Sequence, residues 1–306
     1  MSIVTTIIPI FAVIILGWVA RRKGFVPEEF LEPANRLVFY LAIPAMIFRE
    51  ISKASLKTRF DIKVLCITLF AVVAVFAVSW GMGFVHRIRR GRLGTFIQTS
   101  CHGNLGYIGL AVAYYYLGTE GLVRASIIAG FVMILQNFLS VVALQVCSDS
   151  VPGKEDKLSL LWKILGNPVI VAAMAGILFS LAEIPIPLVV DRSLNILSEL
   201  ALPLALLIIG ASLTFELMRL SIVAIFSSSA LKLILLPGVG FALYRLFGIP
   251  SQDYLPGLIL LASPTATISY VMAKEMRGDT DFAVAAISTS TLLSAVTFSI
   301  WLNIAG

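Results

Sequence analysis

Long runs of apolar residues, separated by short polar segments, occupy most of the chain. A helix needs about 20 mainly apolar residues, with a range of roughly 17–25, to cross the hydrocarbon core of a bilayer. Runs of this kind lie near residues 2–20, 34–50, 63–85, 93–118, 121–147, 160–183, 189–215, 219–247, 254–276 and 280–304. The pattern therefore predicts an all-α polytopic membrane protein with about ten transmembrane helices.

Composition agrees with lipid as the solvent. Of 306 residues, 59% are hydrophobic and 13% charged, whereas soluble proteins contain roughly 25% charged residues. A soluble domain has no place for this much apolar surface. The net charge is +6. In a membrane protein positive charge gathers in the cytoplasmic loops, so we do not take it as a sign of nucleic-acid binding. The three cysteines have neither disulfide nor metal-ligand spacing, so we expect no metal and no cofactor.

The basic residues predict an orientation. The first apolar run has no basic residue before it and Arg21-Arg22-Lys23 after it, which is the reverse of a secretory signal and favours a first membrane span. Thirteen of the 23 Lys and Arg residues lie in odd-numbered loops and eight in even-numbered loops. The excess places the odd loops in the cytoplasm and both termini outside it.

Similar proline-containing segments recur at a constant offset. Leu41-Ala42-Ile43-Pro44 resembles Leu200-Ala201-Leu202-Pro203, 159 residues later, and Pro9 and Pro168 have the same separation. The alternative interpretation is that proline simply recurs in membrane helices.

With five spans in each half, the second copy must enter the membrane upside down. We therefore expect a first repeat over 1–147, a cytoplasmic linker over 148–159 and an inverted second repeat over 160–306. Inverted repeats are typical of secondary transporters, whose substrates bind near the midplane at discontinuous helices.

The fourth span has the composition of a broken helix. It reads Ser100-Cys101-His102-Gly103-Asn104-Leu105-Gly106-Tyr107-Ile108-Gly109, and three glycines with an Asn and a His make a poor continuous helix. The N-terminal ends of half-helices offer free N–H groups and partial positive charge, which suit a carboxylate. The alternative is that the glycines allow close helix packing.

The ninth span is interrupted at the corresponding place. It reads Ala262-Ser263-Pro264-Thr265-Ala266-Thr267-Ile268-Ser269. Pro264 removes a backbone donor and clashes with the preceding turn, and the hydroxyls can bond freed backbone groups. Two matching breaks favour a binding site over packing alone.

Other polar residues in the spans are candidates for the same site. Gln136 and Asn137 lie in the otherwise apolar fifth span, and amides are expected to face the protein interior. His102 could titrate near neutral pH and couple transport to protons, or it could be a neutral, hydrogen-bonded histidine. Lys232 and Glu199 also fall within spans; Lys232 could snorkel or pair with an acid.

At these residues the chain resembles the auxin efflux carrier family, which includes bacterial malonate-type transporters. The resemblance rests on four segments: Gly103-Asn104-Leu105-Gly106-Tyr107-Ile108-Gly109, Gly166-Asn167-Pro168, Val271-Met272-Ala273-Lys274-Glu275 and Ser290-Thr291-Leu292-Leu293-Ser294. It departs from the family at Ala111, where a proline is often found.

The resemblance implies an architecture related to the bile-acid symporters. Helices 1, 2, 6 and 7 would form a scaffold that dimerises, and helices 3–5 and 8–10 a transport domain that moves like an elevator. The chain lacks the long cytoplasmic loop of many plant members of the family. A bacterial type of carrier, in a cell inner or plasma membrane, therefore fits better. The expected substrate-binding residues are Gly103, Asn104, Tyr107, Gln136, Asn137, Pro264, Thr265 and Thr267.

The leading functional hypothesis is a secondary transporter of a small organic anion such as malonate, malate or an auxin-like acid. The alternatives are a sodium-coupled symporter and a membrane receptor that does not transport. An intramembrane enzyme is disfavoured because the sequence contains no HExxH motif, no paired membrane aspartates and no supported Ser–His pair.

Overall fold

The computed structural model describes residues 3–53, 61–147, 168–214 and 221–306. Across these ranges the secondary structure is helical, and the only extended pairing is an isolated bridge between Gly103 and Thr265. The expected linker, and the first residues of the expected sixth span, lie outside the described residues.

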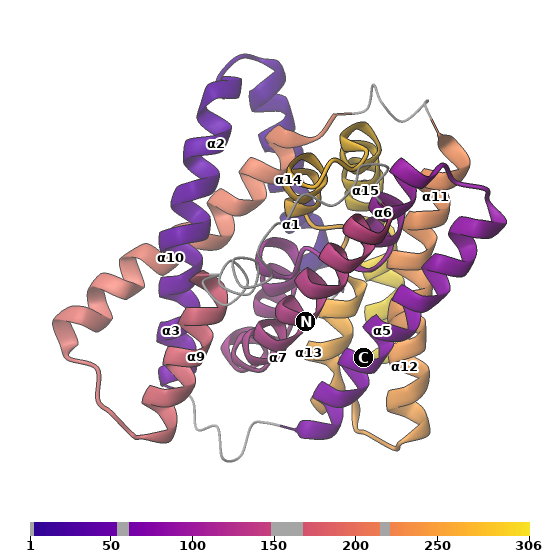
Figure 1. The fold of residues 1–306 in the computed structure, drawn as a ribbon. Helices are drawn as coiled ribbons and strands as arrows, with labels where there is room; N and C mark the ends of the chain where they lie inside the picture. The colour runs from indigo at the N-terminus through magenta and orange to yellow at the C-terminus, as the bar shows by residue number, and fades with distance from the viewer. Residues whose placement is uncertain (1–2, 54–60, 148–167, 215–220) are drawn as a thin grey trace.

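The helices of the first half run as follows: α1 Ile3–Arg22, α2 Glu28–Leu37, the π-helical turn η1 Val38–Ala42, α3 Ile43–Ser52, α5 Ile62–Val85, α6 Arg90–Cys101, the π-helical turn η2 Leu105–Gly109, and α7 Leu110–Val146. Those of the second half are α9 Pro168–Leu181, α10 Leu188–Ser212, α11 Ile222–Ala230, the π-helical turn η4 Leu231–Leu235, α12 Leu236–Leu246, α13 Ser251–Ala262, α14 Ile268–Glu275 and α15 Thr280–Ala305. Figure 1 shows their arrangement.

The prediction of an apolar, all-helical protein is confirmed. In the described ranges, five helical stretches are long and apolar enough to cross a membrane: Ile62–Val85, Leu105–Val146, Leu188–Ser212, Ile222–Leu246 and Thr280–Ala305. Two segments expected from the sequence, the fourth and the ninth, are interrupted, because non-helical residues separate α6 from η2 and α13 from α14. The expected second segment is helical without a gap through α2, η1 and α3.

The stretch from η2 to the end of α7 contains a change of direction. Its 42 residues would extend about 63 Å as one helix, twice the thickness of the hydrocarbon core. Gly118 leaves helical geometry, with φ +72° and ψ −165°. Such a backbone is open to glycine and strained for other residues. Gly118 thus separates the fourth expected span from the fifth.

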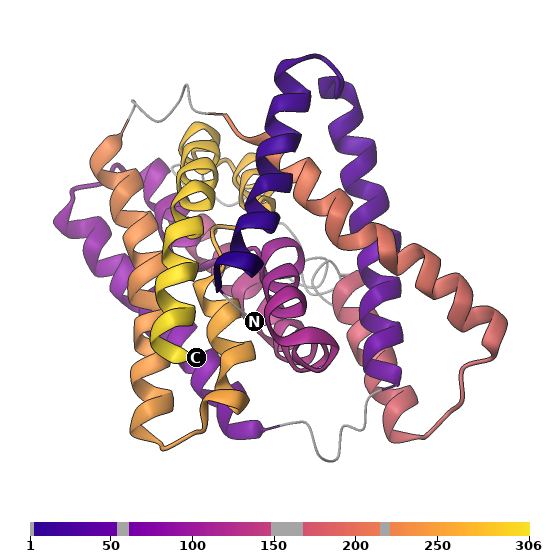
Figure 2. The same cartoon turned by 180° about the vertical axis from the view of Figure 1, so that it is seen from behind.

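Two sets of helices pack mainly among themselves. The helix α10 packs against α1 and α3, and α3 packs against α9. In Figures 1 and 2, α2, α3, α9 and α10 lie on one side of the molecule, and α1 runs from there towards the middle. A glycine on each helix allows α1 and α10 to approach closely. A Cβ atom on Gly17 would collide with the backbone of Leu207, and one on Gly210 with the backbone of Ile14. Small residues at such crossings are typical of membrane helices.

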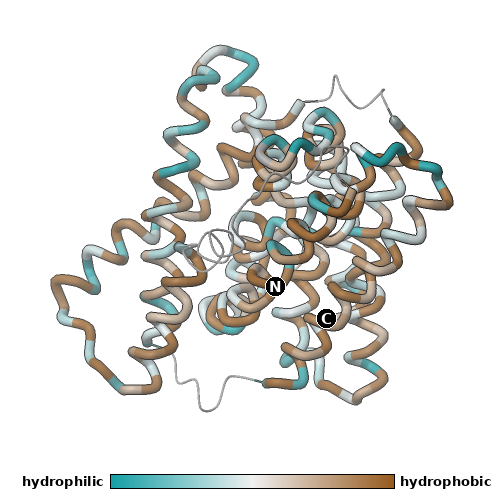
Figure 3. The backbone as a smooth tube through the Cα atoms, viewed as in Figure 1, coloured by the Kyte–Doolittle hydropathy of each residue, from teal (hydrophilic) through white to brown (hydrophobic). Residues whose placement is uncertain are grey.

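The second set lies on the other side. It consists of α5, α6, α7 and α11–α15, with α13 packed against α7 and α12 against α5. Figure 3 shows hydrophobic positions along the long helices and hydrophilic ones near the upper ends of α2 and α6. Large apolar side chains such as Phe70, Ile196 and Val223 are exposed on the outer faces, as expected for surfaces that face lipid.

Candidate functional site

The two broken helices meet at their breaks. The helix α6 ends at Cys101 and resumes as η2 at Leu105, and α13 ends at Ala262 and resumes as α14 at Ile268. Between these ends the two strands of backbone pair with each other. Asn104 N donates to Pro264 O at 2.7 Å, and Ala266 N donates to His102 O at 2.9 Å. Four half-helix ends therefore converge on one antiparallel contact, called the crossover below (102–104 and 263–267).

Local chemistry explains both breaks. Pro264 has no N–H with which to continue α13, and the preceding Ser263 adopts an extended backbone. In α6 the backbone becomes extended at His102, immediately before Gly103. Close approach also requires glycine nearby, because a Cβ atom on Gly109 would lie 2.7 Å from Ser263 Oγ.

An amide from α7 holds the first break. Gln136 Oε1 accepts from Gly103 N at 3.2 Å, and Gln136 Nε2 donates to Cys101 O at 3.0 Å. Gln136 is buried. Its two bonds satisfy a donor and an acceptor that the end of α6 leaves free, and an unmade bond to a buried backbone group is costly.

Hydroxyl groups hold the second break. Thr265 N donates to Ser290 Oγ of α15 at 3.1 Å, and Thr265 Oγ1 donates to Thr99 O of α6 at 2.9 Å. The break in α13 is thus bonded both to its neighbour α15 and to the other broken helix.

Asn104 begins the second half of the fourth span. Its Oδ1 accepts from Tyr107 N at 3.3 Å, which is an N-cap of η2. Asn104 is 5% exposed, and in the described part of the chain its Nδ2 has no hydrogen-bond partner. A buried amide donor without a partner is unusual in a folded protein and calls for an explanation.

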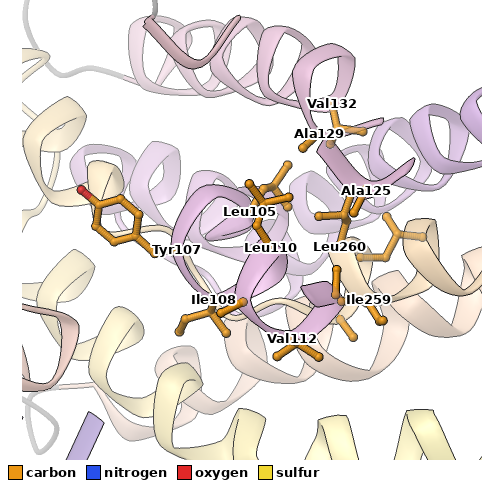
Figure 4. Close-up of a cluster of buried hydrophobic side chains, with 14 of the residues drawn as sticks. Leu105, Tyr107, Ile108, Leu110, Val112, Ala125, Ala129, Val132, Ile259 and Leu260 are labelled. Atoms are coloured by element: carbon orange, nitrogen blue, oxygen red, sulfur yellow. The ribbon is translucent and has the colours of Figure 1, made fainter. Parts of the chain in front are cut away.

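Tyr107 connects the crossover to the other set of helices. Figure 4 shows it on the side of the half-helix away from Ala125, Ala129 and Val132, with its hydroxyl pointing out of the aliphatic cluster. That hydroxyl donates to Asn35 Oδ1 of α2 at 2.5 Å.

Two ionisable side chains lie at the crossover. His102 is buried, and its Nδ1 is 2.9 Å from Ser140 Oγ. Lys232, in η4, has no exposed surface, and its Nζ donates to Leu261 O at 2.7 Å. Neither interpretation of Lys232 from the sequence holds. The side chain does not reach an aqueous surface, and none of the ion pairs within the described ranges involves it.

The structure brings five of the eight expected binding residues together: Gly103, Asn104, Gln136, Pro264 and Thr265. Tyr107 lies one turn further on. Thr267 is half-buried and precedes α14 without a side-chain cap. Asn137 is also half-buried, and it points about 100° around the helix from Gln136.

Sequence reasoning did not identify Thr99, Ser140 or Asn35 as partners of the site, because their bonds join segments far apart in the chain.

A metal site built from side chains needs several ligands close together. Over the ranges that the structure describes, no three His, Cys, Asp or Glu side chains are grouped so that they could hold a metal ion.

An apolar helical bundle in which two interrupted helices cross is typical of secondary membrane transporters. Comparison with known sequences agrees. The model of the family described as "Membrane transport protein" matches residues 2–302, and the chain belongs to this family of auxin efflux carriers.

Curated relatives cover nearly the whole chain at low identity. An "Uncharacterized transporter" of Methanothermobacter thermautotrophicus is 24% identical over 97% of this chain and 96% of its own length. A "Putative malonate transporter" of Rhizobium meliloti is 25% identical over 95% of this chain and 92% of its own. The "Uncharacterized transporter YfdV" of Escherichia coli K12 is 24% identical over 97% of this chain and 96% of its own length.

Proposed function

We propose that this protein is a secondary carrier that binds a small organic anion at the crossover and moves it by elevator-type alternating access. The observation that supports this most is the buried, unpartnered Nδ2 of Asn104. It lies where four half-helix ends converge, and a carboxylate oxygen is the group that would satisfy it. The relative named as a malonate transporter suggests a short dicarboxylate.

The proposed architecture is ten membrane segments in two inverted repeats, over 1–147 and 160–306. The two backbone bonds of the crossover exchange under a two-fold rotation, which supports an inverted relation. Ion pairs at the helix ends support it too. Arg92 near the start of α6 pairs with Asp279 before α15 at 2.6 Å, and Arg124 of α7 pairs with Asp253 near the start of α13 at 2.9 Å.

The proposed division into two bodies follows the packing of the helices. The helices α1–α3, α9 and α10 would be the scaffold, through which the protein would form a homodimer, and the remaining helices would be the transport domain. The bond from Tyr107 to Asn35 crosses between them, so it would break when the transport domain moves. We place the protein in a cell inner or plasma membrane with both termini outside the cytoplasm.

Binding roles at the crossover follow from which atoms are already bonded. We propose that Asn104 contacts the anion, beside Gly103, whose missing side chain leaves room for Leu105 and Lys232. Thr267, Tyr107 and Asn137 would border the site. Gln136, Pro264 and Thr265 would hold its shape, since the polar atoms of Gln136 and Thr265 are already bonded to protein. Proton coupling through His102 remains part of the proposal.

The sodium-coupled alternative needs free oxygen ligands at the half-helix C-termini. Three of these carbonyls already accept protein donors: Leu261 O from Lys232, Cys101 O from Gln136, and Thr99 O from Thr265. We therefore favour transport without a sodium ion at the crossover.

Uptake into proteoliposomes tests the proposal. Labelled malonate, malate and indole-acetate would be offered to vesicles with and without the protein, under proton, sodium or no gradient. We expect saturable uptake of at least one anion, unchanged when choline replaces sodium. Binding without flux under every gradient would refute the carrier and favour a receptor. Flux that requires sodium would favour the symporter.

A further inference from the structure

A buried lysine lies directly behind the crossover. Lys232 comes from the π-helical turn η4 in the middle of the segment 222–246, and none of its surface is exposed. An ionisable side chain at this depth in a membrane protein is costly, and it marks a functional site by default.

The position of the ammonium is defined by two neighbours. Its Nζ donates to Leu261 O in the last turn of α13 at 2.7 Å, where the partial negative charge of a helix C-terminus favours a cation. It also lies beside the first break. A Cβ atom on Gly103 would be 3.2 Å from both Cε and Nζ of Lys232, so the charge is adjacent to the backbone that continues into Asn104.

Among the described residues, no carboxylate forms an ion pair with Lys232. The interhelical ion pairs in these ranges use acids at helix ends, namely Glu28, Asp191, Asp253 and Asp279. A buried charge normally has a partner of opposite sign. At the crossover the ammonium, the free Nδ2 of Asn104 and the N-terminal end of the half-helix that begins at η2 favour negative charge, against the partial negative charge of the C-terminal ends of α6 and α13.

We propose that Lys232 is the residue that selects anions, and dianions over monoanions, at the crossover. This inference rests on the proposed function and adds a specificity-determining residue to it. Lys232 is covered by protein, so it acts through its field rather than by touching the solute. A Coulomb interaction over several ångströms in a protein interior is strong enough to change affinity on the order of tenfold per unit of ligand charge.

A purely structural role predicts something different. If Lys232 only caps α13, its replacement would weaken every ligand equally by disturbing the site. If it selects charge, the loss must grow with the charge of the ligand. The experiment therefore varies the charge of the protein and the charge of the ligand together.

Purified full-length protein would be tested for binding of malonate, its monomethyl ester and malonamide, which carry two, one and no negative charges at neutral pH. The variants are Lys232→Gln, which keeps a donor for Leu261 O, and Lys232→Arg, which keeps the charge. Lys63→Gln is the matched control, because Lys63 is exposed at the start of α5. Thermal unfolding would establish that each variant is folded.

For Lys232→Gln we expect malonate to bind on the order of tenfold more weakly than to wild type. The monomethyl ester should lose less affinity, and the affinity for malonamide should change by no more than about twofold. Lys232→Arg should restore the preference, and Lys63→Gln should match wild type. Equal losses for all three ligands, or malonate binding within about twofold of wild type, would overturn the inference while leaving the carrier intact.

The wild-type protein provides a measurement that does not depend on the variants folding. It should bind malonate most tightly and malonamide most weakly. A preference for the monoester or the amide overturns the role of Lys232. If wild type binds none of the three and transports no organic anion, the proposed function itself fails and the inference fails with it.

Discussion

The two breaks at the crossover pair with each other but differ in length and in chemistry. The first, at His102–Asn104, depends on glycine and is held by one amide, Gln136, which makes two bonds. The second, around Pro264, depends on proline and is held by hydroxyls. Ser290 Oγ accepts from Thr265 N, and Thr265 Oγ1 donates to Thr99 O. Each break donates one of the two backbone hydrogen bonds that join them.

The breaks also differ in what they leave free. Asn104 keeps an unpartnered buried donor, whereas Thr265 of the other break is bonded at both its backbone N and its hydroxyl. The first break therefore keeps an unbonded amide donor, whereas the polar atoms of Thr265 in the second break are bonded to protein. We infer that recognition depends mainly on the first break and shape on the second.

The largest effect is expected from Gln136→Leu, which keeps the side-chain volume and removes both bonds that hold the first break. Leaving Gly103 N–H and Cys101 C=O buried and unpaired should lower the free energy of unfolding by about 2–5 kcal/mol. Reversible unfolding in mixed micelles would measure it. Asn137→Leu, one position along the same helix, is the control, and an equal loss for both variants would contradict a special role for Gln136.

The next effect is expected from Asn104→Asp. Aspartate can still accept from Tyr107 N, but it replaces the free amide donor with negative charge. Because hydrogen bonds to charged groups contribute about 1.5–3 kcal/mol, anion affinity should fall on the order of 10- to 100-fold. Concentration-dependent uptake would measure the fall. Asn303→Asp, at an exposed position near the end of α15, is the control for added charge, and normal affinity in Asn104→Asp would remove Asn104 from the site.

Removing the hydroxyl that holds the second break should cost less. Ser290→Ala leaves only Thr265 N without a partner, so we expect the free energy of unfolding to fall by about 1–2 kcal/mol. Ser294→Ala, whose hydroxyl bonds only within its own helix to Thr291 O, should change it by about 0.5 kcal/mol or less. A larger loss for Ser290→Ala than for Gln136→Leu would reverse the comparison between the breaks.

The smallest effect is expected from Thr267→Val at the start of α14. The side chain is half-buried and does not cap its helix, so stability should change by less than about 0.5 kcal/mol. Because Thr267 would lie at the border of the site, loss of its hydroxyl should weaken anion uptake only about two- to threefold. If Thr267→Val reduced affinity as much as Asn104→Asp, both breaks would take part equally in recognition.

Much of the site was predictable because its residue types are out of place in a membrane helix. Three glycines and Asn104 in one span, and Pro264 with its neighbouring threonines in another, predict interruptions by local chemistry alone. The structure has both interruptions at the expected residues. Gln136 was also correctly expected to face the interior, since an amide in lipid is costly.

Other features were not predictable in this way. The sequence leaves Lys232 with several possible environments, and only the fold determines that it caps α13 beside Gly103. The same holds for the bond between Tyr107 and Asn35, 72 positions apart. Such contacts depend on how helices are rotated and offset against each other, which apolar periodicity does not specify.

By itself, the sequence determined that the chain is an apolar helical membrane protein with two interrupted segments, because hydrophobic runs, glycine and proline act over a few residues. Only the tertiary structure decided that the interruptions pair with each other. It also decided that the polar atoms of Gln136 and Thr265 are bonded in holding that pairing, that Lys232 bonds Leu261 O, and that Asn104 Nδ2 has no partner among the described residues. The physical reason is that a polar atom is free or satisfied according to neighbours that come from distant helices.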